Sequence, residues 1–418
     1  MKQKIRSCIF PNGSRLIAEE MPYLKSSITG LFVKMGSDYE PSHLNGISHM
    51  LEHMIFKGTQ NRDAKEIALE IESLGGVFNA YTARDHTCFY FMSLPGVTSG
   101  IFDIFRDILF RPLIPEDQLE REKTVILEEL KSSDDDPQDV VFQNLNEMIF
   151  EDTQYAKTIL GTRDTIRSIT RDDILEFMHN FYTNKNIFTT YAGPAEFSEV
   201  KKMVKFKNNN AEHTPRVKHF KRIKKQTGRR HYTYKPSLSQ FHAAMGLQGV
   251  RYAHRDKYPL LVLSTILGSG MSSRLFRSLR EDAGYVYEVF SFVEAFFDSG
   301  VLGLYFICDP RNYHKALELI EKEFNEMQKG NISDEEIRKA KTQIISSSTL
   351  SFDTMTGRLR SIARSVMYHD KIKRYSTRIN AIKSVTKNDL QRVARKYLDY
   401  DEYNIALAGG KRKFRDYG

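Results

Sequence analysis

The chain repeats part of itself, and this repetition constrains the fold more than any other feature of the sequence. Residues 168–194 match residues 384–410 at an offset of 216, and residues 115–129 match residues 333–347 at an offset of 218. Two separate matches at nearly the same offset indicate an internal duplication, in which one structural plan is built twice. The sequence therefore predicts two homologous domains.

A strongly basic stretch separates the two copies. Thirteen Lys and Arg residues, against the single acid Glu212, lie between Lys201 and Lys235. Without interleaved aromatic residues or a recognisable binding module, such a stretch is more typical of a solvated linker than of a nucleic-acid site. We predict a first domain at 1–205, a basic linker at 206–232 and a second domain at 233–418, with nucleic-acid binding as a minor alternative and no nucleic-acid partner expected.

The first copy mixes strand patterns with helix patterns. A Pro-Asn-Gly turn closes a hairpin, and a glycine pair at 75–76 ends a helical period before two further strands. The expected strands are 6–10, 14–19, 28–35, 77–82, 86–92 and 187–192, and the first two expected helices are 43–56 and 62–74. This order favours an α+β class, in which each domain is a largely antiparallel sheet covered by helices.

Composition limits where such a chain works. The 62 basic and 53 acidic side chains give a net charge of +9 that is mixed in sign, as on a globular surface. Three widely spaced cysteines form no CxxC pair, and no apolar run has the length of a signal-peptide core or a membrane span. We expect no membrane association and a cytoplasmic location, or the mitochondrial matrix or periplasm if a leader has been removed.

The segment 46–54 carries the clearest chemistry. His49, Glu52 and His53 stand at positions i, i+3 and i+4, so on a helix they share one face. Two imidazoles one turn apart can bind one Zn²⁺, and a carboxylate beside them can take a proton from water. This is the H-x-x-E-H arrangement. The alternative is an amphipathic helix with two surface histidines and a solvated glutamate.

A catalytic zinc needs a third protein ligand, and the predicted helix around 119–130 offers candidates. Glu122 and Glu129 are two turns apart on one face, so one could bind the metal while the other orients a histidine. Glu128 is interpreted as a solvated side chain. In the second copy Ala340 and Ser347 replace the two acids, and no H-x-x-E-H is found there. This asymmetry favours a metal in the first copy alone.

These residues resemble the pitrilysin/insulinase family of zinc peptidases, in particular its short bacterial members that are similar to the mitochondrial processing peptidase. The resemblance spans nearly the whole chain. In that family the third ligand lies about 76 residues after the second histidine, and here that position is Glu129. The resemblance implies that His49, His53 and Glu129 bind one zinc ion per chain, that Glu52 is the general base, and that Glu122 supports the ligands.

Two further segments match the family. Residues 75–82 resemble the edge strand on which substrates lie, which implies that Asn79 and Ala80 bind the substrate backbone. Residues 272–287 resemble the segment whose Arg and Tyr reach the substrate, which implies catalytic roles for Arg280 and Tyr287. Without the resemblance, an ordinary strand and a surface ion-pair residue would be expected.

The resulting prediction is a zinc endopeptidase that acts on peptides or on unfolded or leader segments. Longer family members hold four such domains, so the resemblance implies a chamber formed by paired subunits, either a homodimer or a heterodimer with a related subunit. The alternative is a non-catalytic structural or substrate-recognition subunit. Such subunits usually lack part of the zinc motif, whereas this chain has all of it.

Overall fold

The computed structural model describes residues 3–204 and 227–411. Most of the predicted basic linker lies outside the described residues, and its last residues already belong to a strand. The described chain divides into two compact units, each assembled from three separate stretches. The first unit contains residues 1–131, 157–218 and 350–374, and the second contains residues 132–156, 219–349 and 375–418.

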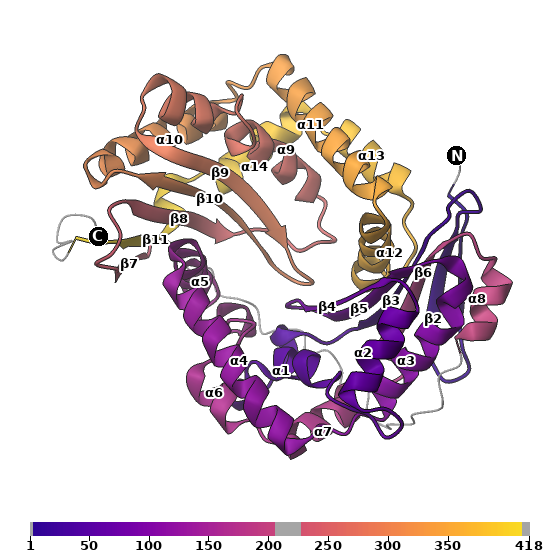
Figure 1. Ribbon diagram of the computed structural model, residues 1–418. Coiled ribbons are helices and arrows are strands. Elements are labelled where there is room, and N and C mark those ends of the chain that lie inside the picture. Colours follow the sequence, from indigo (N-terminus) through magenta and orange to yellow (C-terminus); the bar gives the residue numbers. More distant parts are fainter. Residues whose placement is uncertain (1–2, 205–226, 412–418) are drawn as a thin grey trace. The chain divides into compact units, whose positions relative to one another are not determined.

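The first unit is built on a sheet with the order β1-β2-β6-β3-β5-β4 (Figure 1). Only β2 and β6 run parallel, and every other neighbouring pair is antiparallel. The strands are β1 (Ile5–Ile9), β2 (Arg15–Glu20), β3 (Ser27–Val33), β4 (Val77–Thr82), β5 (Thr87–Ser93) and β6 (Ile187–Gly193). Because β4 stands at one end of this order, it leaves a backbone edge free for pairing.

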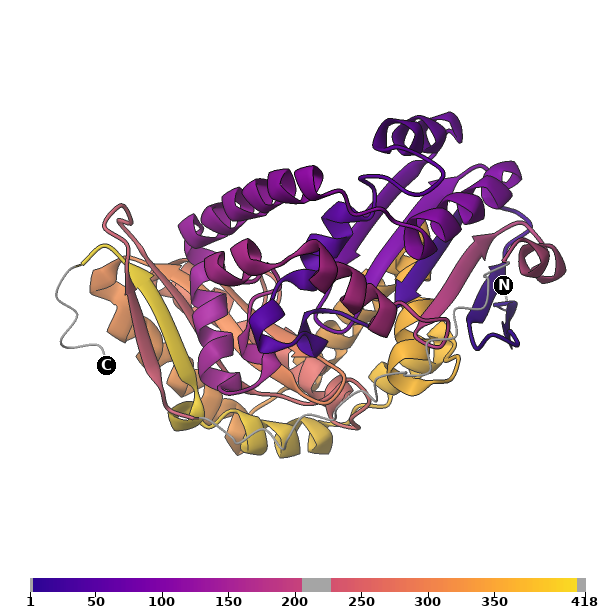
Figure 2. The ribbon, with the colours of Figure 1, turned by 90° about the horizontal axis from the view of Figure 1, so that it is seen from below.

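Helices cover both faces of this sheet. On β3, Leu31 faces a cluster that includes Phe102 and Phe105 of α3, whereas Phe32 faces a second cluster that includes Leu359 of α12. This alternation follows from the two-residue period of a strand. Figure 2 shows α12 against the sheet on the side opposite α3. The helices are α1 (Ile47–Met54), α2 (Ala64–Ser73), α3 (Thr98–Phe110), α4 (Glu116–Asp135), α6 (Arg163–Ser168), α7 (Arg171–Phe181), α8 (Phe197–Met203) and α12 (Met355–His369).

The second unit has a five-stranded sheet with the order β7-β11-β8-β10-β9. Only β7 and β11 run parallel. The strands are β7 (Arg230–Tyr234), β8 (Phe241–Gln248), β9 (Val286–Ala295), β10 (Gly300–Cys308) and β11 (Asn404–Gly409), and the helices are α5 (Pro137–Phe150), α9 (Lys257–Gly268), α10 (Tyr313–Lys329), α11 (Asp334–Asp353), α13 (Tyr375–Lys383) and α14 (Lys387–Tyr397). The predicted α+β class with two largely antiparallel sheets is confirmed.

The two copies exchange equivalent helices. Helices α4 and α11 are both 20 residues long and start 218 residues apart, and α5 and α12 follow them at the same offset. Yet α5 packs on β8 and β11 of the second unit, and α12 packs on β3 and β6 of the first. The units defined by packing therefore differ from the halves 1–205 and 233–418, which remain a prediction about the repeats.

Helix α1 begins four residues later than the sequence pattern predicts. A short 3₁₀ turn (Ser42–Leu44) precedes it, and Gly46 then takes a φ of 96°, which residues with a side chain rarely adopt. The helix therefore starts at Ile47 rather than at His43. It contains both histidines of the motif in its two turns.

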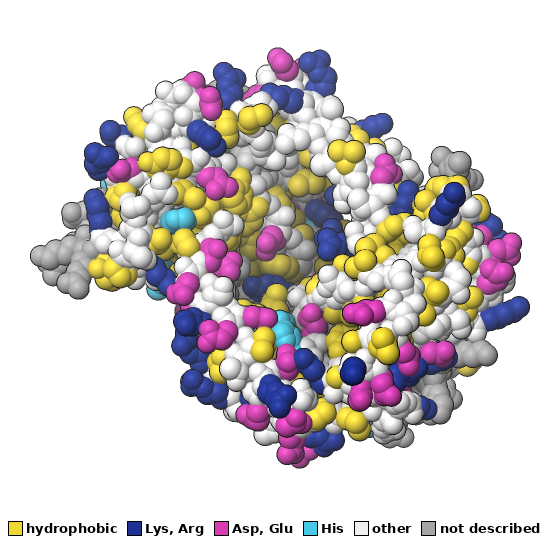
Figure 3. All heavy atoms as spheres, in the orientation of Figure 1, with side chains coloured by type: hydrophobic (Ala, Val, Ile, Leu, Met, Phe, Trp, Pro, Cys, Tyr) yellow, Lys and Arg dark blue, Asp and Glu magenta, His cyan; other side chains and the backbone are white. Residues whose placement is uncertain are grey.

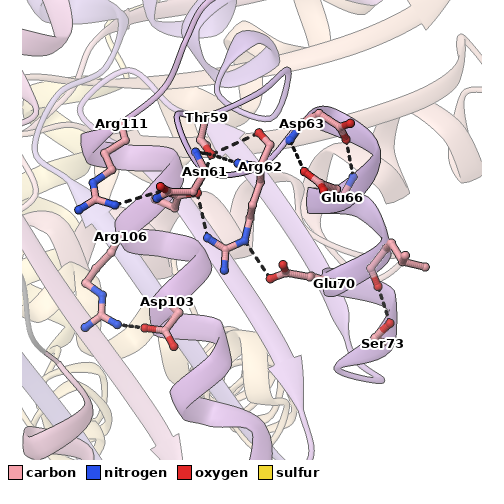
Figure 4. Close-up of polar contacts among 12 residues, drawn as sticks. Thr59, Asn61, Arg62, Asp63, Glu66, Glu70, Ser73, Asp103, Arg106 and Arg111 are labelled. Atoms are coloured by element: carbon pink, nitrogen blue, oxygen red, sulfur yellow. Dashed lines mark hydrogen bonds and ion pairs between the residues drawn. The ribbon is translucent and has the colours of Figure 1, made fainter.

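The loop after α1 is fixed by one buried carboxylate. Asp107 of α3 accepts hydrogen bonds from Thr59 Oγ1 (2.5 Å), Asn61 Nδ2 (2.5 Å) and Arg62 Nη1 (2.9 Å). Figure 4 shows these loop residues, with Arg62 also reaching Glu70 of α2. Among the described residues, no helix has both the length and the apolar character that crossing a membrane would require.

Candidate metal centre

Three donors that lie far apart in the sequence come together in the first unit. One ligand atom each from His49, His53 and Glu129 lies within 4.8 Å of the others. Glu129 Oε2 is 3.7 Å from His49 Nε2 and 3.9 Å from His53 Nε2. Both histidines stand on α1 and the glutamate on α4, so the three residues expected from the sequence are brought together.

Helix α1 presents its polar face because its other face is held in the core. Ile47, Met50, Leu51 and Met54 are fully buried, as expected for the apolar side of an amphipathic helix. The buried carboxylate of Glu40 secures the start of the helix, since it accepts the backbone N–H of Gly46 at 2.7 Å and that of Ser48 at 2.8 Å. A carboxylate at this position satisfies free amide groups and complements the helix dipole. Sequence reasoning missed Glu40.

The donor set fits zinc. Two imidazole nitrogens and one carboxylate are ligands that Zn²⁺ prefers, and three protein ligands leave a position for water. Burial, reinforced by the nearby His53, lowers the pKa of His49 to about 4. His49 is therefore neutral at physiological pH, the form in which an imidazole binds a metal.

His53 is oriented by a chain of charged groups. Its Nδ1 lies 2.9 Å from Glu122 Oε2, and the other oxygen of Glu122 lies 2.5 Å from Lys57 Nζ. Burial opposes ionisation of Glu122, but the hydrogen bonds from Lys57 and His53 outweigh it and lower the pKa of the carboxyl. An ionised partner on Nδ1 directs the lone pair of Nε2 toward the donor cluster. Lys57 was not predicted, although it follows His53 by four residues.

Glu52 lies beside the donors without being one of them. Its Oε2 accepts a hydrogen bond of 2.5 Å from Thr82 Oγ1, the last residue of β4. Burial raises the pKa of Glu52, and the hydrogen bond from Thr82 partly opposes this effect. A carboxylate with a raised pKa is better matched to general-base work near neutral pH. Thr82 was also missed, although it lies in the segment that the sequence analysis singled out.

The predicted substrate residues lie on the free edge of the first sheet. Asn79 and Ala80 are in β4, whose one strand neighbour among the described residues is β5. The side-chain oxygen of Asn79 accepts the Ala80 N–H at 2.8 Å. Asn79 is exposed, so this strand offers a polar side chain and an open backbone edge close in sequence to Thr82.

Arg280 and Tyr287 belong to the second unit, whereas the donors all belong to the first. Arg280 lies in a π-helical stretch (Phe276–Asp282), with its guanidinium 5.0 Å from the centre of the Phe276 ring. Tyr287 is the second residue of β9 and is 56% exposed. Both side chains are accessible. Their catalytic roles stay a prediction.

The second unit carries none of the metal-binding acids. Ala340 and Ser347 occupy on α11 the positions that Glu122 and Glu129 occupy on α4. Since the two helices are equivalent in length and offset, the asymmetry inferred from the sequence also holds for the structure. Within the described residues, the cluster on α1 and α4 is the one group found with metal-ligand geometry.

Comparison with known protein families places the two halves of the chain in one group. Residues 15–163 match the family described as insulinase (peptidase family M16), and residues 168–344 match the peptidase M16 inactive domain. An uncharacterized zinc protease of Bacillus subtilis is 31% identical over 95% of this chain and 96% of its own length. Another, from Streptomyces coelicolor, is 31% identical over 94% and 87% of the two chains.

Solved structures share the fold. A protease from Helicobacter pylori superposes with a TM-score of 0.90 at 22% identity, covering 97% of this chain and all of that one. A peptidase M16 inactive domain from Pseudomonas fluorescens gives 0.89 at 19% identity, with 98% of each chain covered. The class defined by these comparisons is the zinc metallopeptidases. Within that class, the chain belongs to the insulinase family, M16, and zinc is the metal of this family, as predicted.

Proposed function

We propose that this chain is a zinc-dependent endopeptidase of the H-x-x-E-H type that hydrolyses peptides or unfolded and leader segments. The observation that carries the proposal is the convergence of His49, His53 and Glu129 within 4.8 Å, with the Glu52 carboxylate one helical turn from His49. Three ligands and an adjacent base are what metal-assisted peptide hydrolysis requires. One zinc ion per chain follows from the single donor cluster among the described residues.

In this mechanism each residue has a separate task. Zinc held by His49, His53 and Glu129 supplies a Lewis acid that polarises the scissile carbonyl and acidifies water. Glu52 accepts a proton from the attacking water and passes it to the leaving amine, so that one C–N bond breaks and one amine and one carboxylate form. Glu122, ionised and bonded to Lys57, holds His53 in place.

We infer that the substrate lies along β4 as an added strand. The free edge of β4 can pair with an extended peptide by backbone hydrogen bonds. Asn79 and Ala80 would then contact the peptide near the bond that is cleaved. Because backbone pairing is independent of side chains, this mode suits unfolded segments of varied sequence.

We also propose that two subunits pair to complete a chamber, either two identical chains or this chain and a related one. The exposed side chains of Arg280 and Tyr287 would then reach the substrate held by the partner subunit and stabilise the developing oxyanion. Sedimentation velocity of the active enzyme tests this arrangement. A fully active monomer would contradict it.

The cytoplasm is the compartment we propose for this activity. Cys8, Cys88 and Cys308 are all unpaired, which is typical of proteins in a reducing environment. On the face drawn in Figure 3, acidic and basic side chains are interspersed rather than sorted into a continuous basic stripe. That pattern supports a peptide substrate over a nucleic acid.

The first experiment compares the zinc-loaded wild type with Glu52→Gln on a mixture of unstructured peptides, read out by mass spectrometry. The variant keeps all three donors and should bind zinc normally, but its turnover should fall by about 10²–10⁴-fold because the base is lost. Cleavage by the wild type alone supports the proposal. Equal cleavage by both would refute the assignment of Glu52, and cleavage by neither would favour a non-catalytic subunit.

A further inference from the structure

We propose that Thr82 is a positioning residue for catalysis: its hydroxyl holds the carboxylate of Glu52 and thereby ties the base to the strand that receives the substrate. This inference rests on the proposed function. It adds a residue that neither the metal site nor the substrate strand accounts for, and it assigns separate tasks to the two oxygens of Glu52.

The geometry is specific to one oxygen. Thr82 Oγ1 lies 2.5 Å from Glu52 Oε2 and 3.5 Å from the carbonyl oxygen of Ser48. The hydroxyl has one proton, and the much shorter contact assigns it to the carboxylate. A hydrogen bond to an ionised acceptor is about twice as strong as one between neutral groups. With Oε2 bound in this way, Oε1 is the oxygen assigned to proton transfer.

A held carboxylate matters because glutamate is flexible. Its side chain has several rotatable bonds, and an unrestrained base samples rotamers that point away from the substrate. Catalytic groups need to be held within about 0.5 Å of the productive geometry. Thr82 has a β-branched side chain with restricted rotation, so the donor itself is well placed.

The support behind Thr82 is rigid. Thr82 ends β4 and pairs with Thr87 of β5. In the turn that follows, Ala83 donates its N–H to His86 O at 2.8 Å, and Tyr368 of α12 donates to Asp85 Oδ2. The Arg84 carbonyl accepts the N–H of Asp38 at 2.8 Å. The end of β4 is therefore fixed from several sides.

This arrangement joins two parts of the proposed site. Asn79 and Thr82 are three residues apart on the same strand, and Thr82 reaches across to the helix that carries Glu52. A peptide added to β4 is thus placed on the element that also orients the base. Positioning of the substrate and positioning of the base depend on one strand.

The test uses Thr82→Val, which removes the hydroxyl at nearly constant shape, beside Thr82→Ser, which keeps it. We expect the valine variant to lose about 10–100-fold in kcat, as is usual for groups that orient a catalytic residue, with KM and zinc content unchanged. The serine variant should stay within about threefold of the wild type. Thr82→Ala should match the valine variant and replaces it if that variant folds poorly.

Thr87→Val is the matched control, because Thr87 is the cross-strand partner of Thr82 but donates to Met35 O at 3.0 Å and not to Glu52. Its folded fraction should retain the wild-type kcat. A wild-type kcat in both Thr82→Val and Thr82→Ala, or an equal loss in Thr82→Ser, would overturn the proposal. A wild type that cleaves no peptide would instead remove the proposed function, and this inference with it.

Discussion

At the scale of single residues, the chain from Lys57 through Glu122 to His53 separates a structural charge from the metal ligands. Lys57 touches no donor, yet its ammonium lies 2.5 Å from the carboxylate that orients His53. The Lys57 and Glu122 side chains are 29% and 12% exposed, so water replaces this contact only in part. Lys57 therefore acts on the metal site through Glu122.

We expect Lys57→Met to weaken zinc binding about tenfold, the lower end of the usual effect of groups behind a ligand. The carboxylate of Glu122 would lose the partner that fixes it and would orient His53 less well. Competition with a chromophoric chelator measures the change. Lys57→Arg keeps the charge and should stay near the wild-type affinity, and a Lys57→Met variant that binds zinc as tightly as the wild type would contradict the argument.

The residues that could be predicted are those whose relation is local. His49, Glu52 and His53 share a helix face, so their spacing alone predicted the cluster. Glu129 remained one of two alternatives until the family resemblance selected it. Lys57, Thr82 and Glu40 were missed because each acts through contacts with another element, such as β4 against α1, and no period in the sequence encodes such contacts.

At the scale of elements, the loop that follows α1 depends on the buried Asp107. Burial opposes its ionisation, but hydrogen bonds from Thr59, Arg62 and Asn61 lower the pKa of this carboxyl below its ordinary value. A group whose pKa is lower in the folded state stabilises the protein above its unfolded pKa. That contribution is lost as the pH falls through the folded pKa.

Asp107→Asn should therefore destabilise the protein by about 2–4 kcal/mol at neutral pH, since it removes a buried charge from its partners. The difference from the wild type should stay constant down to about pH 5 and shrink below about pH 4, where Asp107 itself becomes protonated. Urea unfolding at several pH values, followed by circular dichroism, measures it.

Asp103→Asn is the control on the same helix (Figure 4). Asp103 pairs with Arg106, but its side chain is 51% exposed, so its loss should cost less than about 1 kcal/mol. An equal cost for the two substitutions, or a cost for Asp107→Asn that does not change with pH, would show that the buried charge is not what holds the loop.

The element boundaries show the limit of periodicity. The apolar period around residues 43–56 was correct for the turns that carry the motif, but it extended the helix past Gly46. Positive φ at one glycine ended the helix there, and the 3₁₀ turn before it continues the apolar pattern without being part of α1. Repeat offsets, in contrast, transferred reliably, because α4 and α11 are equivalent in length and position.

At the scale of the whole molecule, the exchange of α5 and α12 makes each unit depend on both halves of the sequence. The duplication shows which segments are equivalent but not on which sheet each copy packs, so the exchange was not predictable. In the first unit, Leu359, Ile362, Ala363 and Val366 of α12 cover Ile28, Phe32 and their neighbours. In the second, Val141, Leu145 and Ile149 of α5 cover Ala244, Val301 and Tyr305.

We therefore expect the fragments 1–204 and 227–418 to fail when each is expressed alone and to assemble when they are expressed together. Alone, each fragment exposes one apolar sheet face and carries one apolar helix without its sheet, and such surfaces aggregate. Together, α12 can cover the first sheet and α5 the second, as in the intact chain. A tag on one fragment should then recover both, in a complex that binds zinc.

The same pair with Ile362→Asp in the second fragment is the control. Ile362 is 3% exposed in the cluster on the first sheet, and an unpaired carboxylate there would prevent α12 from docking. We expect this pair to recover far less of the first fragment, whereas exposed Leu350→Asp, at 72% exposure, should leave recovery unchanged. A soluble fragment 1–204 with a cooperative thermal transition of its own would mean that the first half folds without α12, and the exchange would then be a contact rather than a requirement.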